Sequence, residues 1–123
     1  MKRRIEIMEE ALPDIAVSIH QNSYPEEYVH GAQVFYHEDS AEGQKLADMI
    51  QKQFVEQVDP ENKRQIKAND SYYLLKKTQV PIVIVECGFL SNYEEAQQLS
   101  GAVYQDRVAW AIYMGIKQYL NGE

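Results

Sequence analysis

One short segment limits the fold more than any other part of the chain: residues 81–85 read Pro-Ile-Val-Ile-Val. A strand whose successive side chains are all apolar has no face for water, so both of its faces must be covered. Strands of this kind lie at the centre of largely parallel sheets, with helices packed against them. The sequence therefore predicts an α/β domain with residues 81–85 at the middle of its sheet.

Other elements follow from residue spacing and from residues that start or stop helices. Residues 15–19 and 31–36 are short apolar runs typical of strands. Ser40 is a good N-cap for a helix that runs to about Gln57, because apolar residues recur there at helical spacing. A last helix is predicted over residues 103–120.

Weaker signals fill the remaining segments. Residues 2–11 are helix-like, Asp59 to Asn62 predicts a turn, and residues 91–100 begin with a capping-box pattern. Residues 63–79 give no clear pattern. About three convincing strands are few for a covered sheet, which usually has more strands and protected edges. We therefore expect that part of the sheet is missing from this sequence.

Composition excludes several classes of protein. The chain has 123 residues and a formal net charge of −7, which argues against a nucleic-acid-binding face. The single cysteine, Cys87, excludes an internal disulfide and a cysteine zinc cluster. No run of about 18 apolar residues is present, so no membrane-spanning helix is expected. The basic start is followed by acidic residues, which is unlike a signal peptide.

Charge is distributed unevenly along the chain. Residues 24–61 hold nine acidic residues against two lysines, and residues 62–80 hold five basic residues, Lys76 among them, against one aspartate. A solvated, polarised surface explains this pattern most simply. The alternative is a basic rim that binds an anionic ligand, with Lys76 among its residues.

Two polar residues follow apolar strands, where open α/β sheets place their sites. His20 follows residues 15–19, and Glu86 follows residues 82–85. A neutral imidazole is a good zinc ligand, and a neighbouring glutamate can take a proton from zinc-activated water. A lone histidine at a strand end is more often a hydrogen-bonded structural residue, so spacing alone leaves both interpretations open.

The other reactive residue types have simpler explanations. His30 and His37 could join His20 in a three-histidine site, but the gaps of ten and seven residues match no short metal-ligand motif. Cys87 is better explained as a buried thiol than as a nucleophile. Asn22 lies two residues past His20, so an extended chain places it on the same side, where it could orient His20 or bind substrate.

Four segments in order resemble the zinc-dependent N-acetylmuramoyl-L-alanine amidases. Residues 18–22 (SIHQN) are similar to the family's S-[IL]-H-x-N segment, and residues 85–92 (VECGFLSN) to its V-E-x-G-F-[LI]-S-N segment. Residues 31–36 (GAQVFY) and 74–81 (LLKKTQVP) resemble the strand between them and the approach to the central strand. The sporulation and germination branch, the CwlD-like amidases, is the most similar.

The resemblance implies hydrolysis of the amide between N-acetylmuramic acid and L-alanine in peptidoglycan. Its zinc ligands are a His, a Glu and a second His, and His20 matches the second His. Glu86 matches the glutamate that acts as general base. Asn22 and Lys76 are the expected substrate-binding residues. Because peptidoglycan lies outside the cytoplasmic membrane, the parent protein is expected to be extracytoplasmic.

The sequence departs from the family at its start. The family's first ligand lies in a D-x-G-H-G segment, and its glutamate ligand lies on the helix that follows; neither segment is found here. We therefore expect residues 1–123 to be the C-terminal portion of one catalytic domain. The sequence would be short either because it is a fragment or because the start codon of the gene was misplaced. We also expect zinc to be absent or weakly bound. The alternative is a non-catalytic cell-wall-binding or regulatory remnant.

The expected architecture is thus a mixed, mostly parallel central sheet covered by helices on both faces, of the phosphorylase/hydrolase-like type. It would lack its first strands and a helix. Their absence would expose a sheet edge, so self-association by strand pairing is expected.

Overall fold

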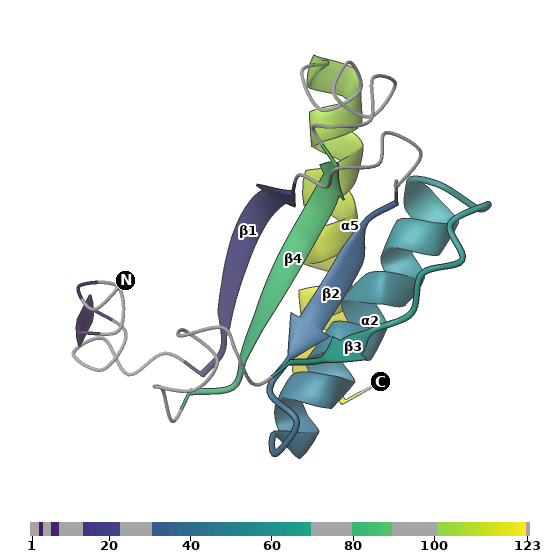
Figure 1. Cartoon of the computed structure of the whole chain (residues 1–123). Coiled ribbons are helices and arrows are strands. Elements are labelled where there is room, and N and C mark those ends of the chain that lie inside the picture. The colour runs from purple at the N-terminus through teal and green to yellow at the C-terminus, as the bar shows by residue number, and fades with distance from the viewer. Residues whose placement is uncertain are drawn as a thin grey trace.

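The computed structural model describes residues 3, 6–7, 14–22, 31–69, 80–89 and 101–122. Within these ranges a four-stranded sheet packs against two long helices (Figure 1). The strands are β1 (Ala16–Asn22), β2 (Gln33–Tyr36), β3 (Lys67–Ala68) and β4 (Ile82–Phe89), and the helices are α2 (Ala41–Gln57) and α5 (Ala102–Leu120). The elements lie close to the predicted ones. The short β3 falls in the segment that gave no clear pattern.

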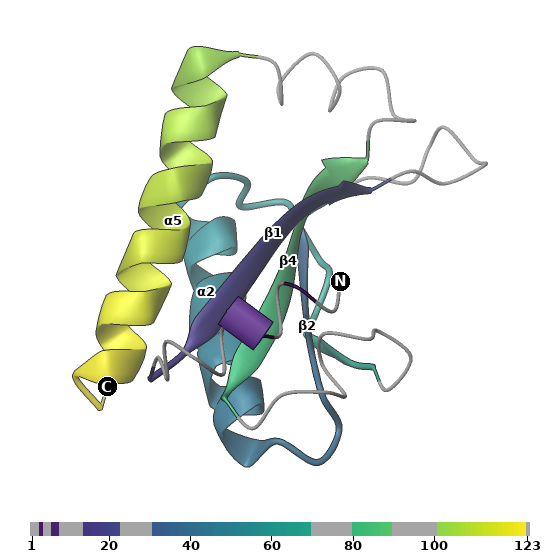
Figure 2. The same cartoon turned by 90° about the vertical axis from the view of Figure 1, so that its left-hand side faces the viewer.

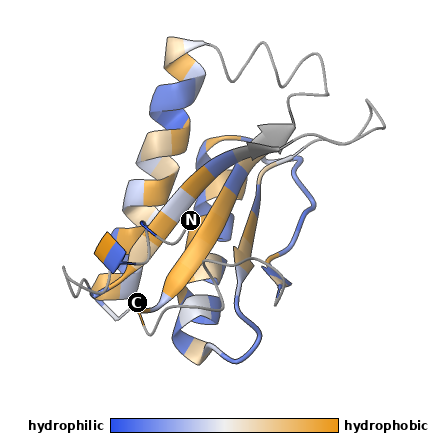
Figure 3. Cartoon of the chain, turned by 60° about the vertical axis from the view of Figure 1, so that its left-hand side comes forward, coloured by the Kyte–Doolittle hydropathy of each residue, from blue (hydrophilic) through white to orange (hydrophobic). Residues whose placement is uncertain are grey.

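The strand order in the sheet is β1-β4-β2-β3. The β1–β4 and β2–β3 pairs are parallel, and β2 runs antiparallel to β4. The sheet is therefore mixed and mostly parallel, and β4 lies between two other strands, both as predicted. Apolar residues fill most of β4, which explains its central position in the sheet (Figure 3).

Both long helices lie on the same face of the sheet (Figure 2). The sequence predicted helices on both faces of the sheet. Within the described residues, the two long helices cover one face. The core lies between this face and the helices. Side chains from the sheet include Val34, Val83 and Val85, and side chains from the helices include Leu46, Ile50, Phe54, Val108 and Ile112.

Close contact between the two helices depends on a glycine. A Cβ atom at Gly115 of α5 would lie 2.7 Å from both Cα and Cγ1 of Ile50 on α2. Real Cβ atoms do not approach other heavy atoms so closely, so only glycine permits this crossing. The ends of the helices are also joined, because the Tyr119 hydroxyl donates a 2.7 Å hydrogen bond to Oε2 of Glu42.

Capping and buried amides complete the packing. The Ser40 hydroxyl accepts a 2.9 Å hydrogen bond from the Gly43 N–H and caps α2, as predicted. Gln51, buried on α2, accepts from the Val34 N–H at 2.9 Å and donates to the Ala32 carbonyl at 3.1 Å. One helix side chain thus satisfies two buried backbone groups at the start of β2.

Three structural expectations lie on segments outside the described residues: most of the 2–11 helix, the 91–100 helix, and the approach at 74–79. No helix in the described part of the chain is long and apolar enough to cross a bilayer.

Candidate active site

Strand register brings His20 and Glu86 together. In the parallel β1–β4 pair, Ser18 is the partner of Ile84 and His20 is the partner of Glu86. Paired residues on neighbouring strands point to the same face, and neighbouring strands lie about 5 Å apart. The imidazole and the carboxylate are therefore neighbours on one face of the sheet.

This face is the one opposite the helices. Side chains alternate along a strand, and Val83, Val85 and Cys87 of β4 belong to the helix-facing side. Ile84 and Glu86 therefore point the other way. Both are buried, and Glu86 is only 4% exposed.

Two strand-end placements differ from the sequence prediction. Glu86 was expected after its strand, but β4 continues to Phe89. His20 likewise lies inside β1, which extends to Asn22. The cause is continued pairing with neighbours, because Asn22 pairs with Phe89 after a register irregularity beyond His20. The two residues lie toward the carboxyl ends of their strands but within the sheet.

Gln33 extends the row onto a third strand. It is the antiparallel partner of Glu86, so its side chain lies on the same face. Its Nε2 donates to the Gln65 carbonyl at 2.8 Å, and its Oε1 accepts from Nη1 of Arg64 at 2.9 Å. These two bonds fix the amide and connect a guanidinium to the residue beside Glu86.

Sequence reasoning missed Gln33 and treated Arg64 only as part of a basic segment. Their position depends on which residues pair across strands, and no local pattern encodes that. The signal that could have found Gln33 is its place in the 31–36 strand, at the end that must lie near Glu86 if the strand runs antiparallel.

The imidazole of His20 has one hydrogen bond within the described residues. Its Nε2 lies 2.8 Å from Oγ of Ser18, two residues earlier on the same face of β1. The contact is partly buried. Ser18 is thus the residue in direct polar contact with the ring.

Of the other predicted site residues, His37 lies away from the His20–Glu86 pair. His37 follows β2 at the end of the sheet away from Glu86, because β2 runs antiparallel from Gln33 beside Glu86 to Tyr36 beside Val83. Its Nδ1 accepts a 3.2 Å hydrogen bond from the Asp39 N–H. The three-histidine alternative is therefore wrong for His37. His30 and Lys76 lie outside the described residues, and so does the side chain of Asn22.

Cys87 is a buried thiol, as predicted. It is 4% exposed and free of any disulfide. Burial, with a smaller contribution from the neighbouring charge of Glu86, raises the pKa of Cys87 from 9.0 to about 11. A buried thiol with a raised pKa is a poor nucleophile at neutral pH, because the thiolate is the reactive form.

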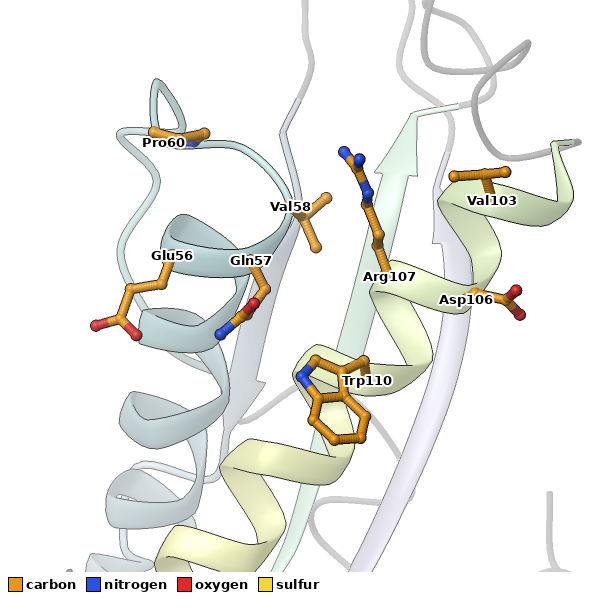
Figure 4. A pocket seen from close by; sticks show the side chains of 8 residues that line it. All are labelled: Glu56, Gln57, Val58, Pro60, Val103, Asp106, Arg107 and Trp110. Atoms are coloured by element: carbon orange, nitrogen blue, oxygen red, sulfur yellow. The ribbon is translucent and has the colours of Figure 1, made fainter.

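Two grooves lie on the helix side of the sheet, and the first of them includes His20. It has a volume of about 450 Å³, runs between β1 and α5, and is lined by Ile19, His20, Cys87, Val108 and Ile112 among others. The other, of about 750 Å³, lies between the end of α2 and the start of α5 (Figure 4). Trp110 and Arg107 line this second groove, and none of its lining residues comes from β1 or β4.

The donor set fits one part of a zinc site. Within the described ranges, no group of three or more His, Cys, Asp or Glu side chains is placed to hold a metal ion. His20 can supply one imidazole, and Glu86 lies beside it as a carboxylate shielded from bulk water. This is the arrangement of one ligand and an adjacent base.

Comparison with known proteins identifies the class. The family model described as N-acetylmuramoyl-L-alanine amidase matches residues 1–118. The germination-specific N-acetylmuramoyl-L-alanine amidase of Bacillus subtilis is 34% identical over 121 residues, which cover 98% of this chain and 51% of that protein. LytC of the same organism is 29% identical over 121 residues, or 97% of this chain and 24% of that protein.

A solved structure gives the same result. The CwlD amidase from Clostridioides difficile, determined in complex with the GerS lipoprotein, superimposes with a TM-score of 0.96 and 41% identity. The match covers 99% of this chain and 62% of that one. Fold and sequence thus define an α/β domain of the cell-wall amidase type. The chain belongs to the N-acetylmuramoyl-L-alanine amidase family, and it spans about half the length of the germination-specific relative.

Proposed function

We propose that this chain is part of a peptidoglycan amidase, to which it contributes one zinc-binding histidine, His20, and the general base, Glu86. The observation that carries the proposal is the β1–β4 register, which sets these two residues side by side on one face. Family membership supports the reaction: hydrolysis of the amide between N-acetylmuramic acid and L-alanine.

The two residues have separate tasks. His20 would hold the metal through a ring nitrogen, and Glu86 would accept a proton from the attacking water at its carboxylate. Glu86 then returns that proton to the amine of the departing L-alanine. Zinc, when bound, supplies Lewis-acid polarisation of the amide carbonyl. The position of Glu86 inside the sheet keeps its carboxylate fixed beside His20, which favours proton transfer to one defined place.

A glutamine variant tests the base. In the complete reading frame that contains this chain, Glu86→Gln is expected to retain zinc but to lower the release of N-terminal alanine from purified peptidoglycan by about 10²- to 10⁴-fold. His20→Ala is expected to lose zinc as well as activity. Exposed Glu56 provides the matched control, because Glu56→Gln should leave both unchanged. Full turnover by Glu86→Gln would contradict the base assignment.

The chain alone is expected to hold zinc weakly. Zinc affinity comes from several ligands placed in advance, and His20 is the one that this proposal assigns here. Metal analysis of the purified 123-residue chain after dialysis against zinc should therefore give well under one equivalent. A full equivalent that His20→Ala does not remove would place the metal elsewhere.

Substrate contacts are proposed for Asn22 and Lys76. Asn22 follows His20 on β1, and Lys76 lies in the basic segment 63–77, which suits the carboxylates of stem peptides. In the complete protein, Lys76→Glu should raise KM for peptidoglycan while leaving kcat nearly constant. Unchanged KM would remove Lys76 from the site. Because the substrate is peptidoglycan, we place the parent protein outside the cytoplasmic membrane.

Self-association of this chain is also proposed. In the described sheet β1 lies at an edge, and Ile19 on its helix side is 60% exposed beside the β1–α5 groove. An open strand edge next to apolar surface favours pairing with a second copy. Analytical ultracentrifugation at tens of micromolar should show a dimer that Ile19→Lys weakens. A monomer at that concentration would contradict this.

A further inference from the structure

The Ser18–His20 contact on β1 bears on which ring nitrogen is the metal ligand. Oγ of Ser18 lies 2.8 Å from Nε2 of His20, which is a good hydrogen-bond distance for this pair. The two residues are separated by one position on the strand, so both side chains point to the same face. The strand therefore places both side chains on the face where this contact can form.

Ser18 has little alternative to this partner on its own row. Its cross-strand neighbour on β4 is Ile84, which offers no polar side-chain atom. The contact is partly buried, so turning the hydroxyl away from His20 would give up a hydrogen bond that is partly shielded from water. The contact should persist when the rest of the site is formed.

A neutral imidazole has one N–H and one lone pair, and the hydrogen bond at one nitrogen decides what the other can do. If Nε2 carries the hydrogen and donates to Oγ, Nδ1 keeps the lone pair that a metal requires. If Ser18 donates instead, Nδ1 carries the hydrogen and cannot bind the metal. Only the first arrangement is compatible with His20 as a ligand.

We propose that Ser18 is a positioning residue: its Oγ accepts a hydrogen bond from Nε2 of His20 and presents Nδ1 as the metal-binding atom. The proposal rests on the proposed function for the role of His20. It assigns Ser18 a task beyond strand formation, because the hydroxyl selects both the tautomer and the direction of the ring. Partners of this kind in metal sites typically change affinity by about 10- to 100-fold.

The test is nitrogen-15 NMR of the histidine rings, recorded where the imidazoles are neutral. The tautomers are measured in the 123-residue chain. The response to zinc chloride is measured in the complete reading frame that contains it, because this chain alone is expected to hold zinc weakly. His20 should show the Nε2–H tautomer, and zinc should shift its Nδ1 resonance. His37 is an internal control for the tautomer measurement, because its Nδ1 accepts from the Asp39 N–H and so is also unprotonated. Its tautomer should not respond to changes at Ser18.

Two variants separate positioning from folding. Ser18→Ala should give a mixture of His20 tautomers and weaken zinc binding at His20 about tenfold. Its backbone amide spectrum should remain that of a folded protein. Ser18→Thr keeps the hydroxyl and should restore both properties. An Nδ1–H tautomer in the unaltered chain, zinc bound through Nε2, or unchanged binding in Ser18→Ala would each overturn the proposal.

A failure of the proposed function would look different. If zinc shifted neither nitrogen of His20, His20 would not be a ligand, and the proposed role of Ser18 in orienting a metal ligand would be wrong as well. The tautomer measured without zinc would then still report the Ser18–His20 hydrogen bond by itself. The two failures are thus distinguished by separate resonances.

Discussion

The two faces of β4 have different tasks although they are built from alternate residues of one strand. Val83, Val85 and Cys87 point toward α2 and α5 and belong to the apolar core. Ile84 and Glu86 point to the opposite face, where Glu86 lies beside His20 and Gln33. One face provides stability, and the other provides the proposed chemistry.

This difference shows that strand register serves both tasks at once. A slip of one residue in β4 would move Glu86 into the core and a core valine onto the site face. Burial of three apolar side chains therefore specifies the register that sets Glu86 beside His20. Changes on the helix side should alter stability, and changes on the site side should alter metal binding and turnover.

The largest loss of stability is expected at Phe54 on the helix side. Its side chain is fully buried, so Phe54→Ala should lower the free energy of unfolding by about 3–5 kcal/mol. Urea denaturation followed by circular dichroism measures this. Lys52→Ala on the exposed side of α2 should change stability by less than about 0.5 kcal/mol. Equal effects of the two substitutions would mean that α2 does not pack on the sheet.

Burial of the Cys87 thiol on the helix side should make both the stability of the protein and the reactivity of this thiol depend on pH. With its pKa raised from 9.0 to about 11, the folded protein holds the proton where the unfolded chain releases it. Stability from this group is complete below about pH 9 and falls as the pH rises through about 11. At pH 8, iodoacetamide should react about a hundredfold more slowly with the native chain than with the urea-unfolded chain. Similar rates would show that Cys87 is accessible.

Gly115 tests the helix crossing. Gly115→Ala would force a Cβ against the backbone of Ile50, so we expect a loss of about 1–3 kcal/mol in unfolding free energy despite the better helix propensity of alanine. Ala109→Ser adds one atom on the exposed side of the same helix and should be nearly neutral. A stabilised Gly115→Ala variant would rule out the close α2–α5 approach.

The smallest effect is expected where the helix ends meet. The pKa of Tyr119 is raised to about 12, mainly by its hydrogen bond to Glu42. Because the pair is exposed, Tyr119→Phe should lower the free energy of unfolding by less than about 1 kcal/mol. The same substitution should remove the tyrosinate absorbance step near pH 12. Glu42→Gln should lower that midpoint in the unaltered tyrosine. No change in the midpoint would mean that the bond does not form in solution.

Much of the fold could be predicted because it is encoded locally. Ser40 has the side chain that a helix N-cap needs, and the spacing of Leu46, Ile50 and Phe54 marks the face that α2 buries. The apolar run at 82–85 likewise required a covered, central strand. These features depend on neighbours within one or two turns, so the sequence pattern is sufficient.

The site could be predicted only in part. His20 and Glu86 were singled out because each is a polar residue directly after an apolar strand run, and the family motifs supported them. Gln33 and the Ser18 contact were not, because both depend on the pairing of segments far apart in the chain. His37 shows the same limit from the other side: its place in the sequence near β2 suggested the site, but strand direction puts it at the far end.

The edge position of β1 has a consequence for how activity would be lost on heating. His20 and Glu86 are 66 positions apart (86 − 20), and in the described sheet β4 is the strand that holds β1. An edge strand can separate while the sheet–helix core remains intact, in an opening of lower free energy than global unfolding. Amide hydrogens of β1 should then exchange sooner than those of β2 and α2, and His20 would leave Glu86 before the protein melts.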